Sequence, residues 1–358
     1  MTPRAHNLGA GPAVLPVEVL TEAREALLSF GDTGVGILEL SHRSDAFVAV
    51  REEAEARLRR LAGAGDDWAV LFLQGGASLQ FHMVPLNLGA DADYVVTGVW
   101  AQKALDEARR LGPARVAATS EATGHDRLPA ALDVRPGAAY VHYTSNNTIY
   151  GTQWRAPPAA GEVPLVCDAS SDVFSRPLDL DRHGLVYAGA QKNLGPAGVT
   201  VVWARRDLLE RSAGRGLPPM LDYAVQAKHD SSYNTCPTFG IYVVGLVARW
   251  LEAQGGLEAI AARNEAKAAR VYAALDAAPE VYRGHARPEA RSLMNVTFRL
   301  VDEALEPRFL EEAAARGLVG LKGHRALGGL RASLYNALPA AAVDALVAFL
   351  GDFARGRG

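Results

Sequence analysis

The chain has 358 residues, of which 49% are hydrophobic and 22% are charged, and its formal net charge is −3. This composition describes an ordinary globular protein that is long enough for two domains, and its charge gives no electrostatic reason to expect nucleic acid or a membrane as a partner. Because only two cysteines are present, Cys167 and Cys236, the sequence excludes a disulfide framework and a metal site built from cysteines alone, and it favours the reducing cytoplasm.

Short apolar strands alternate with helices up to residue 254. Apolar positions at helical spacing predict helices over 17–30, 45–61, 101–111 and 239–254. Short apolar runs predict strands over 69–73, 94–97, 138–143, 163–167 and 185–189. Such alternation is typical of an α/β fold with a mainly parallel sheet that helices cover on both faces. The longest apolar run is shorter than the roughly 20 residues of a membrane span, so we expect none.

One segment departs from this alternation. The apolar run 199–203 follows the strand 185–189 after a turn much shorter than the dozen or so residues that a parallel crossover needs. We therefore predict that 199–203 lies antiparallel to its neighbours in the sheet.

The pattern changes again near residue 256. Helices are expected over 257–278, 307–316 and 339–355, and strands over 292–300, 318–321 and 329–333. These elements form an α+β unit. We therefore expect a large domain over 16–256 and a smaller domain made of 1–15 and 257–358.

Two charged residues follow strands of the predicted sheet. Lys192 comes shortly after the strand 185–189, and Asp168 lies 24 residues earlier, directly after the strand 163–167. Active sites in open α/β sheets gather beyond the carboxyl ends of the strands. An amine that can form a Schiff base and an acid that can bond a pyridinium nitrogen are what a pyridoxal phosphate site requires. A surface lysine and a turn aspartate are the ordinary alternatives.

Two further features occupy similar positions. The turn 75–78, Gly-Gly-Ala-Ser, joins a strand to a helix, where backbone N–H groups can bind a phosphate. Trp100 follows the next strand, and its ring could stack on a planar cofactor. Glycines are common at such turns and tryptophans are common in cores, so neither feature identifies a cofactor alone.

A separate set of residues could bind anions, because arginine matches carboxylates and phosphates bidentately and histidine adds a donor. Each member is also typical of a solvated surface. The set consists of His42 with Arg43, His324 with Arg325, and Arg331.

The segment 188–198 closely resembles the cofactor-lysine segment of phosphoserine aminotransferases, which belong to the class-V aminotransferases. Similar blocks occur in the family's order along almost the whole chain, at 11–16, 39–44, 74–81, 84–88, 142–151, 233–239 and 321–333. The resemblance implies a pyridoxal phosphate enzyme of fold-type I. Such an enzyme has a mainly parallel, seven-stranded type of sheet with one antiparallel strand, a smaller α+β C-terminal domain, and active sites shared within a homodimer.

The resemblance also implies roles for the residues around the cofactor. Lys192 would bind its aldehyde, Asp168 would bond its pyridine nitrogen, Trp100 would stack on its ring and Thr148 would bond its phenolic oxygen. The cofactor phosphate would be held by Gly76, Ala77 and Gln191, joined by Asn234 and Thr235 of the partner subunit.

For the substrate, the resemblance implies that Arg331 takes the α-carboxylate. The distal phosphate would be held by His42 and Arg43, with His324 and Arg325 reaching across the dimer. Some members of the family carry arginine where this chain has Ser78, which supplies no charge. The distal anion would then depend more heavily on the two His-Arg pairs.

The implied reaction is transamination between glutamate and 3-phosphohydroxypyruvate, which gives O-phosphoserine and 2-oxoglutarate in serine biosynthesis. Use of the related phosphorylated 2-oxo acid of vitamin B6 synthesis, 3-hydroxy-2-oxo-4-phosphonooxybutanoate, stays open. Alternatives are an alanine–glyoxylate aminotransferase, which has no use for two His-Arg pairs, and a cysteine desulfurase, whose mobile cysteine neither Cys167 nor Cys236 matches well. A scaffold without pyridoxal phosphate is the remaining alternative.

Overall fold

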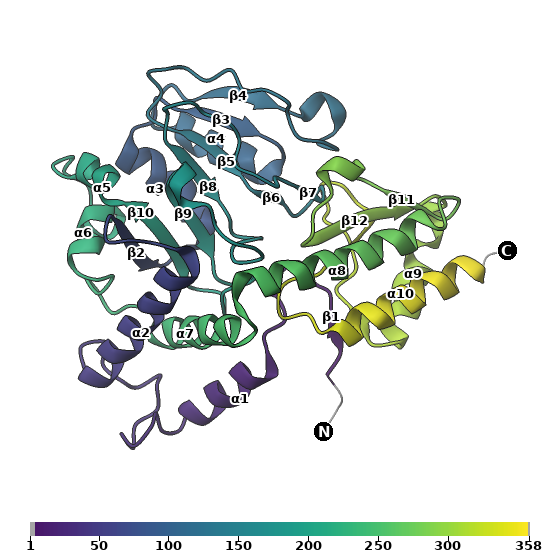
Figure 1. The fold of residues 1–358 in the computed structure, drawn as a ribbon, viewed down its shortest axis with the longest axis horizontal. Coiled ribbons are helices and arrows are strands. Elements are labelled where there is room, and N and C mark those ends of the chain that lie inside the picture. Colours follow the sequence, from purple (N-terminus) through teal and green to yellow (C-terminus); the bar gives the residue numbers. More distant parts are fainter. Residues whose placement is uncertain (1–3, 357–358) are drawn as a thin grey trace.

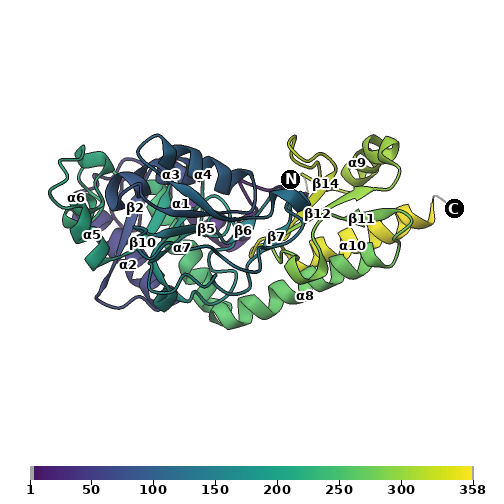
Figure 2. The same ribbon diagram turned by 90° about the horizontal axis from the view of Figure 1, so that it is seen from above.

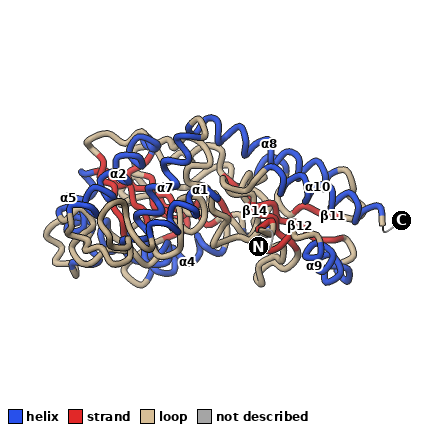
Figure 3. Tube along the Cα trace, turned by 90° about the horizontal axis from the view of Figure 1, so that it is seen from below, coloured by secondary structure: helices blue, strands red, loops and turns tan. Residues whose placement is uncertain are grey.

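The structure is a computed structural model that describes residues 4–356. Two lobes lie side by side along the long axis of the molecule (Figures 1 and 2), and helices enclose the strands of the larger lobe (Figure 3). The larger lobe contains a seven-stranded sheet. In spatial order its strands are β2 (Trp68–Leu73), β10 (Thr200–Arg205), β9 (His183–Gly189), β8 (Leu165–Asp168), β5 (Val141–Thr144), β3 (Asp93–Val96) and β4 (Arg115–Thr119).

The strand β10 runs antiparallel to both of its neighbours. Thr200 lies opposite Gly189 of β9 on one side and opposite Leu73 of β2 on the other. All other pairings in this sheet are parallel. The predicted mainly parallel sheet with an antiparallel 199–203 segment is therefore confirmed, because the short connection between β9 and β10 leaves no room for a crossover helix.

Helices cover both faces of the sheet, so its strands are buried on both sides. Along β10, Val201 and Trp203 belong to one hydrophobic cluster, whereas Val202 and Ala204 belong to another, as the two-residue period of a strand requires. The cluster of Trp203 includes residues of α1 (Val17–Ala26), α2 (Asp45–Ala62) and α7 (Thr238–Ala253). The other cluster includes residues of α3 (Gly76–Leu88), α4 (Val99–Arg109), α5 (Arg206–Ser212) and α6 (Tyr223–Lys228).

The smaller lobe has its own hydrophobic cluster. An antiparallel sheet of β11 (Tyr282–Gly284), β12 (Asn295–Leu300) and β14 (Leu330–Ser333) packs with α8 (Gly256–Asp276), α9 (Glu306–Ala315) and α10 (Ala340–Arg355). The N-terminal strand β1 (His6–Asn7) pairs with β13 (Leu318–Val319), and Leu8 is fully buried in this cluster. On this basis we propose the division into a 16–256 domain and a domain of 1–15 with 257–358.

The structure differs from the expected elements in two informative places. The first helix ends at Ala26 instead of continuing to residue 30, and Leu28 beyond it is 86% exposed. The edge strand β4 was not expected, because an edge strand that is only partly buried lacks a continuous apolar run. Among the described residues, no helix is long and apolar enough to cross a membrane.

Replacing Trp203 by alanine should destabilise the larger lobe strongly. The side chain is fully buried on the antiparallel strand and packs edge-on against Phe174, with 5.4 Å between the ring centroids. The resulting cavity should lower the free energy of unfolding by about 3–5 kcal/mol. Urea denaturation followed by circular dichroism measures this change. Val301→Ala, at a half-exposed position, is the control and should shift the midpoint little.

Candidate active site

A cavity of about 250 Å³ lies at the carboxyl ends of the central strands. The sequence-predicted residues that line it are Gly76, Ala77, Trp100, Thr148, Asp168, Gln191 and Lys192. Asp168 is the last residue of β8, and Lys192 follows the neighbouring strand β9. The sheet therefore brings together side chains that come from five separate segments of the chain.

The amine and the carboxylate at this cavity influence each other electrostatically. Burial lowers the pKa of Lys192, and the negative charge of Asp168 opposes this effect. Burial likewise raises the pKa of Asp168, while hydrogen bonds from Ser170 and the charge of Lys192 favour its ionised form. The backbone N–H of Ser170 donates to Asp168 Oδ1 over 3.0 Å. Both groups thus meet the conditions under which a lysine amine becomes a base and a carboxylate holds a cation.

The wall formed by the N-terminus of α3 suits a phosphate. Gly75 and Gly76 have φ values of 87° and 64°, which place the backbone in the left-handed region that favours glycine. No side chain caps this helix, and its first turn contains no acid. Its free N–H groups and the positive end of its dipole can therefore bind an anion.

The opposite wall is built around Thr148. The Trp100 indole N–H donates to Thr148 Oγ1 over 3.1 Å, which orients the ring. Arg331 of the smaller lobe donates to the Thr148 carbonyl over 2.8 Å, while its buried Nε has no partner among the described residues. Burial lowers the pKa of Arg331. A partly buried guanidinium with a donor to spare is suited to bind a carboxylate.

The N-terminal segment closes the lysine turn from outside. The Ala13 N–H donates to the Gln191 carbonyl over 2.8 Å. Gly11 has φ 137°, and a Cβ there would lie 3.6 Å from two carbons of the Lys192 side chain. The backbone at Gly11 therefore packs directly against the lysine in a conformation that other residues rarely adopt.

Seven sequence-predicted site residues do not line this cavity: His42, Arg43, Asn234, Thr235, His324, Arg325 and Arg331, the last of which contacts its wall through the Thr148 carbonyl. Among them, Arg43, Asn234, Thr235 and Arg325 are exposed. The loop after α6 and the helix α2 are joined by Arg51, which donates to the Asp230 carbonyl over 3.3 Å and to Ser232 Oγ over 3.2 Å. Burial lowers the pKa of His324, and the positive charges of Arg331, Arg325 and Lys103 add to this effect.

Several polar residues at the site were not predicted from the sequence, among them Thr144 and Lys103. Thr144 lines the cavity, and its buried Oγ1 has no hydrogen-bond partner among the described residues. Lys103 places its ammonium 4.7 Å from the centroid of the Trp100 ring. The signal for Lys103 was its position three residues after Trp100, which puts both on one face of α4.

Replacing Asp168 by asparagine should lower the pKa of Lys192 further, because the carboxylate charge now supports the ammonium form. In the cofactor-free protein, Lys192 should then react with trinitrobenzenesulfonate at a pH lower by about one unit or more. Mass spectrometry of the Lys192 peptide across a pH series measures this profile. The exposed Lys228 in the same digest is the control, and an unchanged profile for Lys192 contradicts the coupling.

Comparisons with known proteins agree with this geometry. The family model described as "Aminotransferase class-V" matches residues 5–346. The phosphoserine aminotransferase of Herpetosiphon aurantiacus is 52% identical, and that of Lysinibacillus sphaericus is 53% identical, each over 99% of this chain and 99% of the relative.

Solved structures give the same result. Phosphoserine aminotransferase from Bacillus circulans subsp. alkalophilus is 50% identical and superposes with a TM-score of 0.97 over 100% of both chains. The pyridoxal phosphate-bound phosphoserine aminotransferase from Trichomonas vaginalis is 37% identical, with a TM-score of 0.92 over 97% of this chain and 99% of that one. The chain therefore belongs to the class-V aminotransferase family.

Proposed function

We propose that the chain is a pyridoxal phosphate-dependent phosphoserine aminotransferase. It would transfer the amino group of glutamate to 3-phosphohydroxypyruvate, giving O-phosphoserine and 2-oxoglutarate. The observation that carries this proposal is the placement of Lys192 and Asp168 at one cavity in a chain about half identical to phosphoserine aminotransferases over its full length.

The residues present at the cavity fit the cofactor. Asp168 offers a buried carboxylate. Within residues 4–356, the buried hydroxyl oxygen of Thr144 has no hydrogen-bond partner and no side chain caps the N-terminus of α3. We assign Lys192 to the aldehyde, Asp168 to the ring nitrogen and Trp100 to the ring face. Thr148 is assigned to the phenolic oxygen. We assign the phosphate to Gly76, Ala77 and Gln191, with Asn234 and Thr235 of the partner subunit.

When bound, pyridoxal phosphate supplies an electron-withdrawing ring that stabilises negative charge on the substrate α-carbon. The chain supplies the proton transfer. Burial favours the uncharged amine of Lys192, which can take the proton from the α-carbon and hold it on Nζ. The guanidinium of Arg331 binds the substrate α-carboxylate and so orients the α-carbon toward this amine.

Two different substrates can share this pocket, because glutamate and the phosphorylated 2-oxo acid both carry an anion at the far end. Ser78 adds no charge there, so we assign this anion to His42 and Arg43, with His324 and Arg325. The position of Lys103 beside Trp100 adds a cation at the same side of the site. The same pocket would accept the phosphorylated 2-oxo acid of vitamin B6 synthesis, 3-hydroxy-2-oxo-4-phosphonooxybutanoate.

We also propose that the enzyme is a homodimer with shared active sites. Several assigned residues are exposed and lie outside the cavity of their own chain. Apolar side chains are also exposed along 17–38, among them Leu28 at 86% and Leu38 at 62%. Exposed apolar side chains clustered in one segment are typical of an association surface. The cysteines Cys167 and Cys236 are both free, which fits a cytoplasmic location.

The two alternative enzymes that share this fold, an alanine–glyoxylate aminotransferase and a cysteine desulfurase, receive less support. Alanine–glyoxylate aminotransferase from Nostoc sp. superposes with a TM-score of 0.76 but is 18% identical, which shows the fold alone. A cysteine desulfurase would need a reactive cysteine. Both cysteines of this chain are buried, and burial raises the pKa of each thiol, so neither resembles a reactive thiolate.

Steady-state kinetics should show parallel double-reciprocal lines for glutamate and 3-phosphohydroxypyruvate, because one product leaves before the second substrate binds. Lys192→Ala should lower kcat by roughly 10²–10⁴-fold or more, since the proton carrier is lost. The exposed Lys228→Ala is the control. Intersecting lines, or retained turnover in Lys192→Ala, would contradict the proposal.

Mixing two inactive variants should restore activity if the sites are shared. Lys192→Ala lacks the amine, and the double variant Asn234→Ala with Thr235→Ala lacks the partner's phosphate contacts. Unfolded, mixed and refolded together at equal amounts, about half of the dimers should be mixed, and each should hold one intact site, giving about a quarter of wild-type turnover. Sedimentation velocity checks that the mixture forms dimers. If dimers form but activity does not recover, Lys192, Asn234 and Thr235 belong to the site of a single subunit, and shared sites are contradicted.

A further inference from the structure

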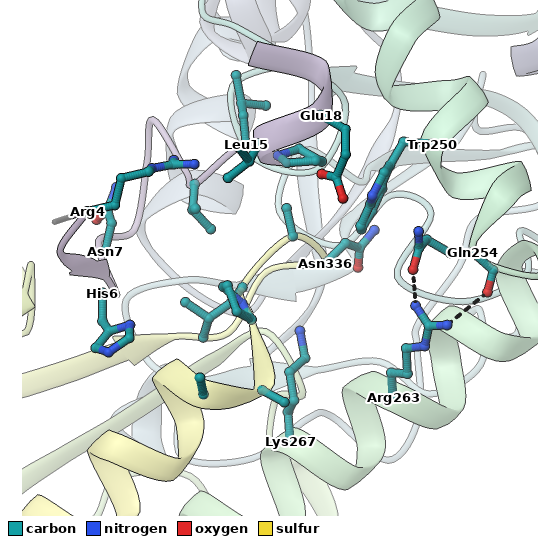
Figure 4. A pocket seen from close by; sticks show the side chains of 18 of the residues that line it. Arg4, His6, Asn7, Leu15, Glu18, Trp250, Gln254, Arg263, Lys267 and Asn336 are labelled. Atoms are coloured by element: carbon teal, nitrogen blue, oxygen red, sulfur yellow. Dashed lines mark hydrogen bonds between the residues drawn. The ribbon is translucent and has the colours of Figure 1, made fainter. Parts of the chain in front are cut away.

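A second and larger cavity, of about 740 Å³, lies between the two lobes and away from the active site. Its walls come from the N-terminal segment, the start of α1, the end of α7, the middle of α8 and the segment 336–341. Figure 4 shows Trp250 of α7 on one side and Lys267 of α8 rising from the floor. Its size lies within the range of small-molecule sites, which are about 300–1,000 Å³.

The lining is mostly apolar and also carries several cationic groups. Val14, Leu15 and Leu338 form apolar wall, and Trp250 adds an aromatic face. The charged residues of the lining are Arg4, Arg263, Lys267, Arg270 and Glu18. Glu18, the single acid among them in the described part of the chain, is exposed at the edge. An apolar pocket with a few convergent charged groups is the usual form of a binding site.

Lys267 is the most informative of these residues. It is only 8% exposed, yet its ammonium donates to two backbone carbonyls, of Leu334 and Tyr335, each over 2.8 Å. No carboxylate pairs with it within residues 4–356. Two of its three N–H donors are thus engaged, and one remains for a ligand. A buried ammonium without a counter-charge is costly, so an anion at this position would be favourable.

Arg263 lies one turn earlier on α8 and faces the same cavity. Its guanidinium donates to the Gln254 side chain and, over 3.1 Å, to the Gln254 carbonyl, both uncharged acceptors (Figure 4). Burial lowers the pKa of Lys267 to about 7, and the Arg263 charge adds to this effect. A bound anion would oppose both the burial and the Arg263 charge, and so would raise the pKa of Lys267 again. By contrast, Arg270 already pairs with Asp344 and is less available.

We propose that this cavity binds a small organic anion whose carboxylate meets Lys267 and Arg263 and whose apolar body packs against Trp250. The charge of the ligand follows from the two cations that have no counter-ion among the described residues, and its apolar part follows from the apolar and aromatic residues of the lining. The site is separate from the catalytic cavity, because the two cavities share no lining residue.

The test uses phenylbutyrate and its uncharged amide, phenylbutanamide, as matched probes. Calorimetric titration of the cofactor-loaded enzyme should give an affinity for the carboxylate about tenfold or more above that for the amide, because a charge-assisted hydrogen bond is lost in the amide. Equal affinities, or no binding of either probe, overturn the proposal.

The location is tested by filling the cavity. Ala266 is exposed on α8 and lines it, so Ala266→Trp should weaken phenylbutyrate binding at least about tenfold. Ala262→Trp is the matched control, since Ala262 is exposed on the same helix outside the lining. An unchanged affinity in Ala266→Trp places the probe elsewhere, for example at Arg331 of the active site, and overturns the proposal.

The role of charge is tested by two variants. Lys267→Met should reduce phenylbutyrate affinity toward that of the amide and leave amide binding unchanged. Because this variant leaves two buried carbonyls without their donor, Arg263→Gln at an exposed position provides a second test that leaves the core intact. Arg283→Gln, exposed and remote from the lining, is the control. A carboxylate preference that survives in both test variants overturns the assignment.

Discussion

The site depends on holding an amine and a carboxylate together in a place where water is largely excluded. Either charge alone would be costly there. Burial raises the pKa of Asp168 and lowers that of Lys192, and both shifts favour the neutral form of the group. The register of the sheet makes the pair possible, because Asp168 of β8 lies opposite Tyr187 of β9, and the β9 chain then turns back at Lys192. The remaining parts of the cavity close around these two positions.

The antiparallel strand β10 explains why the lysine turn is so compact. After β9 the chain makes a tight turn in which the N–H groups of Leu194 and Gly195 bond to the Ala190 carbonyl, and Ala190 bonds to Val199. A parallel crossover would require a long connection at this point and would carry Lys192 away from the sheet. Gly195 lets the turn approach α7, since a Cβ there would lie 3.0 Å from Val244. The direction of one strand therefore determines where the amine lies.

Much of this arrangement could be predicted from the sequence, because it follows from local patterns. The antiparallel β10 followed from the length of one connection, and the Lys192 and Asp168 pair followed from two strand ends. By contrast, Leu28 continues the apolar pattern of α1 but is exposed, because a helical pattern alone does not show whether an apolar position is buried. Thr144 could not be predicted, because a threonine at the end of a strand has no distinguishing sequence pattern and only the structure shows that it lines the cavity.

Residue pairs distant in the sequence were beyond such local reasoning. The bond between Arg331 and the Thr148 carbonyl joins the two lobes. The residue pattern alone made Arg331 a candidate anion-binding residue, but only a resemblance to known proteins suggested a role for Thr148. The Asn193 side chain makes the same kind of connection. Its Oδ1 accepts from the Asn336 N–H over 3.0 Å, and its Nδ2 donates to the Val173 carbonyl over 3.1 Å.

This junction links Lys192, to which we assign the proton transfer, with Arg331, to which we assign the substrate carboxylate, through a short path. Asn193 follows Lys192 directly, and Asn336 lies shortly after β14, the strand that carries Arg331. The Asn336 side chain also donates to the Phe174 carbonyl and accepts from Asn264 of α8, each over 2.8 Å. Buried polar networks of this kind are stable only when their members are all paired, so they fix geometry more strictly than apolar contacts do. The distance between Lys192 and Arg331 is therefore set by the junction of the lobes. If these two residues have the roles that we propose, the position of one lobe on the other helps to define the active site.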